Sequence, residues 1–236
     1  MNHCKYVGGE LDVFDLARRW KAYWSRVVGR YLTGEVLEVG AGIGANVRYL
    51  IRPGVRSLTL LEPDGDLLQR LQSRSWECSR AVPMHYAQGT LESLDPAKRF
   101  DAIIYVDVLE HIEDDYSEVA RAESLLCEGG HLIVVAPAHP FLFSEFDKAI
   151  GHFRRYTRKS LIKLTPAHSD MVDCRYLDSI GLMASLANAV LIRQALPTAS
   201  QIRFWDSVLV RLSTLTDPLL AYSLGKSVVA VWRRRQ

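Results

Sequence analysis

A glycine-rich turn at residues 40–44 constrains the fold of this chain more than any other feature. It follows a short β-rich run at residues 35–39 and precedes a helical stretch at residues 45–51. Glycines between a strand and a helix permit a tight turn and let a ligand approach the backbone closely. Glu62 ends the next apolar run, about 20 residues beyond the first glycine, where α/β folds hold the hydroxyls of a ribose. The sequence therefore predicts a nucleoside-binding α/β domain.

Strand-like and helical runs alternate along the rest of the chain. Apolar, β-rich runs occupy residues 57–61, 84–87, 100–106, 131–136, 171–177 and 227–232. Helical patterns occupy residues 64–72 and 114–126, and Asp64 is placed to cap the first of them. Apolar strands that alternate with helices indicate a parallel sheet covered on both faces. We therefore expect an α/β fold with a doubly wound, seven-stranded, mostly parallel sheet.

Both ends of the chain add helical segments to this core. Apolar residues at helical spacing predict an amphipathic helix over residues 13–31. A second helical region, residues 182–196 and 204–224, precedes the last strand. We expect a single domain in four parts: an N-terminal helical lid (1–34), the core sheet (35–178), a helical insertion (179–225), and the last strand with a basic tail (226–236).

Composition excludes several classes of protein. The formal net charge is +2 and the basic residues are scattered, which argues against a nucleic-acid partner. The four cysteines (Cys4, Cys78, Cys127 and Cys174) form no CxxC pair and are interpreted as reduced packing residues. The longest uncharged apolar stretch, residues 179–192, is shorter than the roughly 20 residues of a membrane span, and the N-terminus lacks a signal-peptide core. We therefore predict a cytoplasmic protein.

The glycine turn alone is compatible with two kinds of nucleoside cofactor. Gly40, Gly42 and Ala45 also fit the dinucleotide fingerprint, so an NAD-dependent oxidoreductase is a distant alternative. Glu38 lies two residues before the first glycine. Its carboxylate would repel an anionic pyrophosphate and attract a cationic sulfonium amino acid. This charge favours a sulfonium cofactor.

Four segments of the chain carry a family resemblance. They are residues 36–44 (VLEVGAGIG), 61–64 (LEPD), 100–112 (FDAIIYVDVLEHI) and 129–137 (GGHLIVVAP). In this order they resemble the motifs of class I S-adenosylmethionine-dependent methyltransferases, in particular their bacterial small-molecule branch. The resemblance implies a Rossmann-like methyltransferase fold, S-adenosyl-L-methionine as the cofactor, and methyl transfer to a small-molecule acceptor in biosynthetic or secondary metabolism.

The resemblance also assigns cofactor-binding residues. Glu62 would bind both ribose hydroxyls, and the turn at residues 88–91 would flank the adenine. Family members often carry an aspartate near position 90, where this chain has Thr90, so Gln88 or a backbone amide would replace that contact. The full set of cofactor-binding residues is Glu38, Gly40, Ala41, Gly42, Gly44, Asn46, Glu62, Pro63, Gln88, Gly89, Thr90, Leu91, Asp107 and Val108.

Candidate catalytic residues follow the fourth strand. Methyl transfer needs a base only when the acceptor must lose a proton. His111 is the first candidate, because histidine titrates near neutrality, with Asp107 and His152 beside it. A loop-bracing role for Glu110 and His111 is the alternative. Asp107, Glu110 and His111 also resemble a metal-binding ExxEH cluster of some ubiquinone-pathway and small-RNA methyltransferases, with His152 as a further ligand, but we expect no metal.

Predicted acceptor contacts lie in the N-terminal helix and in the loop that follows the fifth strand. The residues are Tyr23, Trp24, His152, Arg154 and Tyr156. Residues 151–161 resemble a segment of bacterial methyltransferases of sugar and secondary-metabolite pathways. An anionic acceptor would favour Arg154 or Arg155. A lipid-linked or glycosylated acceptor is the alternative, because Trp232 and the basic residues after it suit contact with a membrane surface. The apolar helices would also suit a homodimer.

Overall fold

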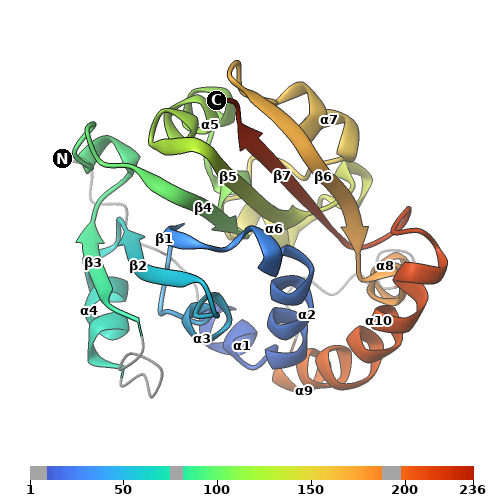
Figure 1. Cartoon of the computed structure of the whole chain (residues 1–236). Coiled ribbons are helices and arrows are strands. Elements are labelled where there is room, and N and C mark those ends of the chain that lie inside the picture. Colours follow the sequence, from blue (N-terminus) through green and yellow to red (C-terminus); the bar gives the residue numbers. More distant parts are fainter. Residues whose placement is uncertain (1–9, 75–81, 188–197) are drawn as a thin grey trace.

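The computed structural model describes residues 10–74, 82–187 and 198–236. Within these residues the strands form one seven-stranded sheet, in the order β3-β2-β1-β4-β5-β7-β6 (Figure 1). Only the pairs that involve β7 are antiparallel, so the expected mostly parallel sheet is confirmed. The strands are β1 (Gly34–Val39), β2 (Val55–Glu62), β3 (Met84–Gln88), β4 (Phe100–Val106), β5 (Leu126–Pro137), β6 (Ser169–Leu177) and β7 (Ser227–Arg234).

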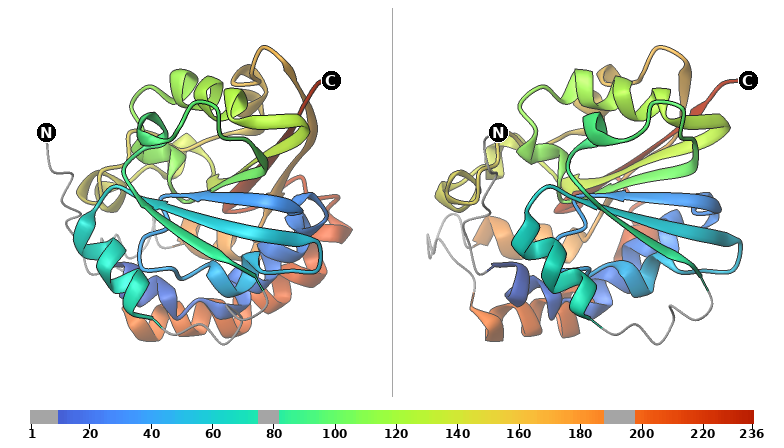
Figure 2. Two further views of the ribbon diagram at one scale, coloured as in Figure 1. Left: turned by 60° about the vertical axis from the view of Figure 1, so that its left-hand side comes forward. Right: turned by 90° about the vertical axis from the view of Figure 1, so that its left-hand side faces the viewer.

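Helices cover both faces of the sheet, as Figure 2 shows. They are α1 (Glu10–Asp15), α2 (Arg18–Val28), α3 (Val47–Leu50), α4 (Gly65–Ser73), α5 (Asp115–Ser124), α6 (Glu145–Ala149), α7 (Arg158–Lys163), α8 (Ser179–Ala187), α9 (Ala199–Phe204) and α10 (Val210–Leu219). Val36 belongs to the core cluster on the face covered by α2 and α10, whereas Leu37 belongs to the cluster covered by α5 and α7. Because neighbouring strand residues point to opposite faces, both must be apolar.

The predicted helix over residues 13–31 is broken. α1 ends at Asp15 and α2 begins at Arg18. Asp206, in the π-helical turn between α9 and α10, accepts hydrogen bonds from the backbone N–H groups of Arg19 (3.1 Å) and Trp20 (2.8 Å). A helix start leaves such N–H groups without partners, so this distant carboxylate acts as the cap that α2 lacks in its own sequence.

The helical insertion before β7 also differs in detail from its prediction. α8 covers the first predicted helix as far as Ala187, and the part at residues 188–196 lies outside the described residues. The second predicted helix is divided into α9, the π-helical turn and α10, which ends at Leu219. No helix in the described part of the chain is long and apolar enough to span a membrane.

Several residues of the basic tail, which the sequence suggests for contact with a membrane surface, make contacts within the protein. Trp232 is fully buried in the core. Arg234 donates hydrogen bonds to the carbonyls of Glu123, Ser124 and Leu126, and Arg235 pairs with an aspartate. Arg234 therefore holds the end of β7 against the end of α5 and the start of β5, whereas Arg235 holds it beside β6. Cys127 and Cys174 are free, as expected, and Cys4 and Cys78 lie outside the described residues.

Candidate functional site

The glycine turn lies at the carboxyl edge of the central strands. β1 pairs with β2 and β4, so Val39, Leu61 and Tyr105 meet at this edge. Gly40 and Gly42 have φ angles of +69° and +53°, which strongly favour glycine. A Cβ atom on Gly40 would lie 2.6 Å from a methyl carbon of Val108. The backbone can therefore make this close turn only with glycine, as predicted.

Glu62 is anchored by the backbone of two neighbouring turns. Its carboxylate accepts hydrogen bonds from the N–H groups of Gly42 (2.7 Å) and Asp64 (3.0 Å). Burial raises its pKa, and the two backbone donors partly oppose that shift. One N–H on each carboxylate oxygen leaves further lone pairs for a ligand with two adjacent hydroxyl groups. The geometry suits the ribose role expected from the sequence.

Glu38 presents a buried acceptor without a partner. One carboxylate oxygen accepts a hydrogen bond from the Asn46 amide at 2.9 Å, and the other has no hydrogen-bond partner among the described residues. Burial raises the pKa of Glu38 to about 8. A buried carboxylate with a free oxygen is stabilised by a cationic ligand group. Asn46, predicted to touch the cofactor, orients Glu38.

The remaining cofactor candidates surround this pair of carboxylates. Gly89 donates its N–H to the carbonyl of Glu62 at 3.1 Å, which fixes the turn after β3 beside β2. Gln88 and Thr90 are exposed there, whereas Leu91 is buried. Ala41 and Gly44 complete the glycine turn, and Pro63 is exposed beside Glu62. Their contacts with a cofactor remain predictions, made from positions that the fold brings to one edge.

The end of β4 has an unusual backbone. Asp107 adopts a left-handed conformation with φ of +54° and donates its N–H to the carbonyl of Val135 at 2.8 Å. Such angles in a non-glycine residue gather at functional sites. The following 3-10 turn (Leu109–His111) then places Glu110 inside the protein and His111 toward the loop at residue 152. Asp107 itself is exposed.

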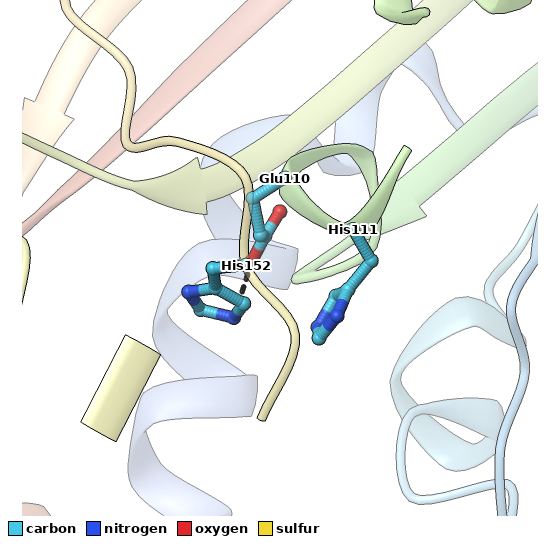
Figure 3. Close-up of side chains that lie close together, drawn as sticks. All are labelled: Glu110, His111 and His152. Atoms are coloured by element: carbon cyan, nitrogen blue, oxygen red, sulfur yellow. Dashed lines mark ion pairs between the residues drawn. The ribbon is translucent and has the colours of Figure 1, made fainter. Parts of the chain in front are cut away.

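Glu110, His111 and His152 converge at this point (Figure 3). The imidazole rings of His111 and His152 meet edge to face, with centroids 4.5 Å apart. The Nε2 atom of His152 lies 3.8 Å from Oε1 of Glu110, and neither oxygen of Glu110 has a hydrogen-bond partner among the described residues. Burial raises the pKa of Glu110 well above its usual range. Burial and the neighbouring His152 lower the pKa of His111 to about 4, so His111 is neutral at pH 7.

His152 is oriented by a carboxylate that the sequence analysis missed. Its Nδ1 atom lies 2.9 Å from Oδ1 of Asp147. Asp147 also accepts two hydrogen bonds from Arg155, at 2.8 and 3.0 Å. Burial alone would raise the pKa of Asp147, but the hydrogen bonds from His152 and Arg155 hold it below its usual range. The ionised carboxylate keeps the proton of His152 on Nδ1, which leaves Nε2 as an acceptor toward the site.

Several predicted acceptor contacts are wrong. Trp24 is fully buried, and Tyr23 is buried with its hydroxyl bonded to Asp217 at 2.8 Å. Tyr156 is also buried and donates its hydroxyl to Asp115 at 2.8 Å. Their large apolar surfaces serve the core. Both tyrosine hydroxyls have partners inside the protein, and the indole N–H of Trp24 is buried without a hydrogen-bond partner among the described residues.

Both candidate arginines are committed to carboxylates. Arg154 pairs with Asp115 at 2.7 Å, and Arg155 is held by Asp147. Two lysines that the sequence analysis overlooked lie within electrostatic range of Asp107 instead: Lys21 and Lys226. Lys21 is buried, and burial lowers its pKa to about 8. Neither lysine forms an ion pair with a described residue. The ammonium of Lys21 instead donates to the carbonyl of Phe14, and the ammonium of Lys226 lies over the ring of Trp205.

The histidine cluster offers two kinds of chemistry. With Nδ1 held by Asp147, His152 can accept a proton at Nε2. The site could instead hold a divalent ion. Its ligands would be a ring nitrogen of His152, a ring nitrogen of His111 and the carboxylate of Glu110, whose ligand atoms lie within 4.8 Å of one another. Asp107, the first residue of the ExxEH-like motif, is not part of this group of atoms.

Comparisons with known proteins agree with this architecture. Residues 15–178 match the model of a family described as a methyltransferase domain. A demethylmenaquinone methyltransferase of Tropheryma whipplei (strain Twist) is 30% identical over 145 residues, which cover 61% of this chain and 57% of that protein. A ubiquinone biosynthesis O-methyltransferase of Rhodopseudomonas palustris (strain HaA2) is 24% identical over 99 residues, 42% of this chain and 38% of that protein. The chain thus matches less than two thirds of the length of these relatives.

A solved methyltransferase structure has a similar fold. The N-methyltransferase NodS from Bradyrhizobium japonicum WM9, in complex with S-adenosyl-L-homocysteine, superposes with a TM-score of 0.57 at 16% identity. The superposition covers 93% of this chain and 86% of that chain. The antiparallel β7 inserted between β5 and β6 differs from the 3-2-1-4-5-6 order of dinucleotide-binding folds.

Proposed function

Because this chain belongs to the class I S-adenosylmethionine-dependent methyltransferase family, we propose that it transfers the methyl group of S-adenosylmethionine to a small-molecule acceptor in biosynthetic metabolism. The observation that carries this proposal is the pair of buried carboxylates beside the glycine turn. Glu62 supplies two oxygens with spare lone pairs, and Glu38 supplies an unpartnered oxygen. A nucleoside that also carries positive charge satisfies both groups.

The cofactor supplies the reactive methyl group, and the protein supplies position and a dry environment. Glu38 and the glycine turn would hold the methionine part, and Glu62 would hold the ribose. The turn at residues 88–91 would flank the adenine. Leu11 of α1 lies 3.8 Å from the place where a Cβ on Gly42 would be, so the proposed N-terminal lid covers this turn. Val108 packs against it from the other side.

We propose His152 as the general base where the acceptor must lose a proton. Its Nε2 atom is the acceptor left free by the Asp147 contact. His111, the first candidate from the sequence, is a weaker base because its pKa lies near 4. His111 and Asp107 would instead contact the acceptor or the methionine end of the cofactor. The proton from an acceptor hydroxyl or amine would pass to His152 as the carbon–sulfur bond breaks.

Calorimetric titration tests the cofactor assignment. We expect S-adenosylhomocysteine to bind with a dissociation constant in the micromolar range and NADH and NADPH not to bind. Binding of a nicotinamide cofactor alone would contradict the proposal and restore the oxidoreductase alternative.

An acceptor screen with labelled S-adenosylmethionine would then define the substrate. Phenols, amines and quinols should be compared with a lipid-linked or glycosylated set, since relatives carry the names of quinone-pathway enzymes. Label on a free small molecule supports the first proposal. Label only on lipid-linked or glycosylated compounds supports the alternative.

A further inference from the structure

An exposed apolar stripe runs along the helical rod formed by α9, the π-helical turn and α10. Its members recur every three or four residues, which is the spacing of one helix face. The stripe and the exposed fraction of each residue are Phe204 (57%), Val208 (40%), Leu212 (45%), Leu215 (65%) and Leu219 (85%). Isolated exposed leucines are ordinary, but a continuous row of this kind indicates an interaction surface.

Charge on the same rod is segregated. Its two acidic residues, Asp206 and Asp217, point inward and accept hydrogen bonds from α2 and from the start of α8. Its two basic residues, Arg203 and Arg211, are exposed. The rod therefore offers solvent an apolar row with positive charge only.

α2 packs beside α10 (Figure 1). It carries no acidic residue. Arg19 and Arg26 of α2 and Arg211 of α10 line a hollow of about 180 Å³ between the two helices. None of these three arginines forms an ion pair with a described residue. Three guanidinium groups around one hollow suit a phosphate group, which they can bind through paired hydrogen bonds.

A second copy of the chain fits this surface poorly. Two-fold pairing would bring the arginines of one copy against those of the other. The acidic side chains nearest in α1, Asp12 and Asp15, are already paired with Arg70 and Arg74. An anionic surface with an apolar interior satisfies both the stripe and the hollow.

We propose that the α2–α10 face docks on an anionic phospholipid surface. The apolar stripe enters the boundary of the acyl chains, Arg203 and Arg211 lie at the level of the headgroups, and a lipid phosphate occupies the hollow beside Arg19 and Arg26. α9 also contacts α1, which lies over the glycine turn. Docking through α9 therefore brings the lipid close to α1, the helix that covers the glycine turn, which goes beyond the proposed activity.

Co-sedimentation with vesicles tests this inference. Vesicles of phosphatidylcholine alone should retain little protein, and vesicles with an equal share of phosphatidylglycerol should retain at least tenfold more. R203E/R211E should lose at least tenfold of that binding, and L212S/L215S/L219S a similar amount. K159E/K163E is the matched control on α7, where both lysines are exposed and lie beside the exposed Ile162. This control should bind like the unaltered protein.

These outcomes test lipid docking independently of the proposed methyl transfer. S-adenosylhomocysteine affinity and the melting temperature should stay unchanged in all variants, because the altered residues are exposed and lie outside the cofactor site. Equal binding to both kinds of vesicle, no binding to either, or equal loss in the α7 control would overturn the lipid surface. A dimer in light scattering that the leucine variant converts to monomer would assign the face to a second copy instead.

Discussion

The two halves of the candidate site are built in different ways. On the cofactor side, Glu38, Gly42 and Glu62 lie at or just beyond the ends of β1 and β2, and backbone N–H groups hold Glu62. On the acceptor side, His111 and His152 are far apart in the chain, and side chains hold one another in place. The first half depends on local backbone geometry, whereas the second depends on how a long loop returns to β4.

This difference has a consequence for mutation. A carboxylate held by backbone donors leaves those donors buried and unsatisfied when it is removed, so its loss damages both ligand contact and the turn. A histidine held by another side chain can be removed with less disturbance of the backbone. The cofactor half should therefore respond through binding, and the acceptor half through turnover.

The largest effect is expected for Glu62→Ala. It removes the contacts to two hydroxyl groups and the acceptor for the N–H groups of Gly42 and Asp64. S-adenosylhomocysteine affinity should fall about 100-fold or more, since each hydrogen bond to a charged group contributes roughly 1.5–3 kcal/mol. Calorimetry measures this, with Glu92→Ala on the exposed surface as the control. Unchanged affinity would remove Glu62 from the cofactor site.

The next effect, on the acceptor side, should appear in turnover alone. His152→Ala should lower kcat about 100-fold with an acceptor that loses a proton, while S-adenosylhomocysteine affinity stays within about twofold. Asp147→Asn should cause a smaller loss of kcat through the orientation of His152, and His111→Ala a smaller loss than His152→Ala. A larger loss for His111→Ala than for His152→Ala would exchange their proposed roles.

Glu38 should give the cofactor half a measurable pH dependence of stability. Its pKa is raised by burial from 4.5 to about 8. Between these values the folded protein holds a proton that the unfolded chain releases, so the free energy of unfolding falls as pH rises, by about 1.4 kcal/mol per pH unit. Urea unfolding from pH 5 to 8 measures this slope. Glu38→Gln should flatten it, and the exposed Glu92→Gln should not; equal slopes in both variants would place the effect elsewhere.

The smallest effect is expected for metal removal. If Glu110, His111 and His152 act without a metal, dialysis against EDTA should leave turnover unchanged. Loss of turnover that Mg²⁺ restores would contradict this expectation and would make the three side chains ligands, with Asp147 as the carboxylate that orients His152.

The cofactor half could be predicted from sequence because its residues stand at fixed distances from strand ends. Glycine at a positive φ and an acid at the end of the next strand leave a pattern in the chain. The acceptor half could be predicted only in part. Asp147 acquires its role because its loop returns to β4. Lys21 and Lys226 acquire their positions near Asp107 from contacts between residues far apart in the sequence. Neither arrangement leaves a local pattern. Tyr23, Trp24 and Tyr156 illustrate the opposite error, since aromatic side chains are as suited to a core as to a pocket.

The cap of α2 also determines when this helix can become fully hydrogen-bonded during synthesis. Asp206 follows Arg19 by 187 residues, yet it satisfies the first N–H groups of α2. At about 5–20 residues per second, a ribosome would need on the order of ten to forty seconds to deliver that carboxylate after α2 has been made. During synthesis, the start of α2 must therefore wait for a carboxylate that lies 187 residues further along the chain. A chain truncated before residue 206 should carry an α2 with a frayed start, even though β1 to β6 are all present.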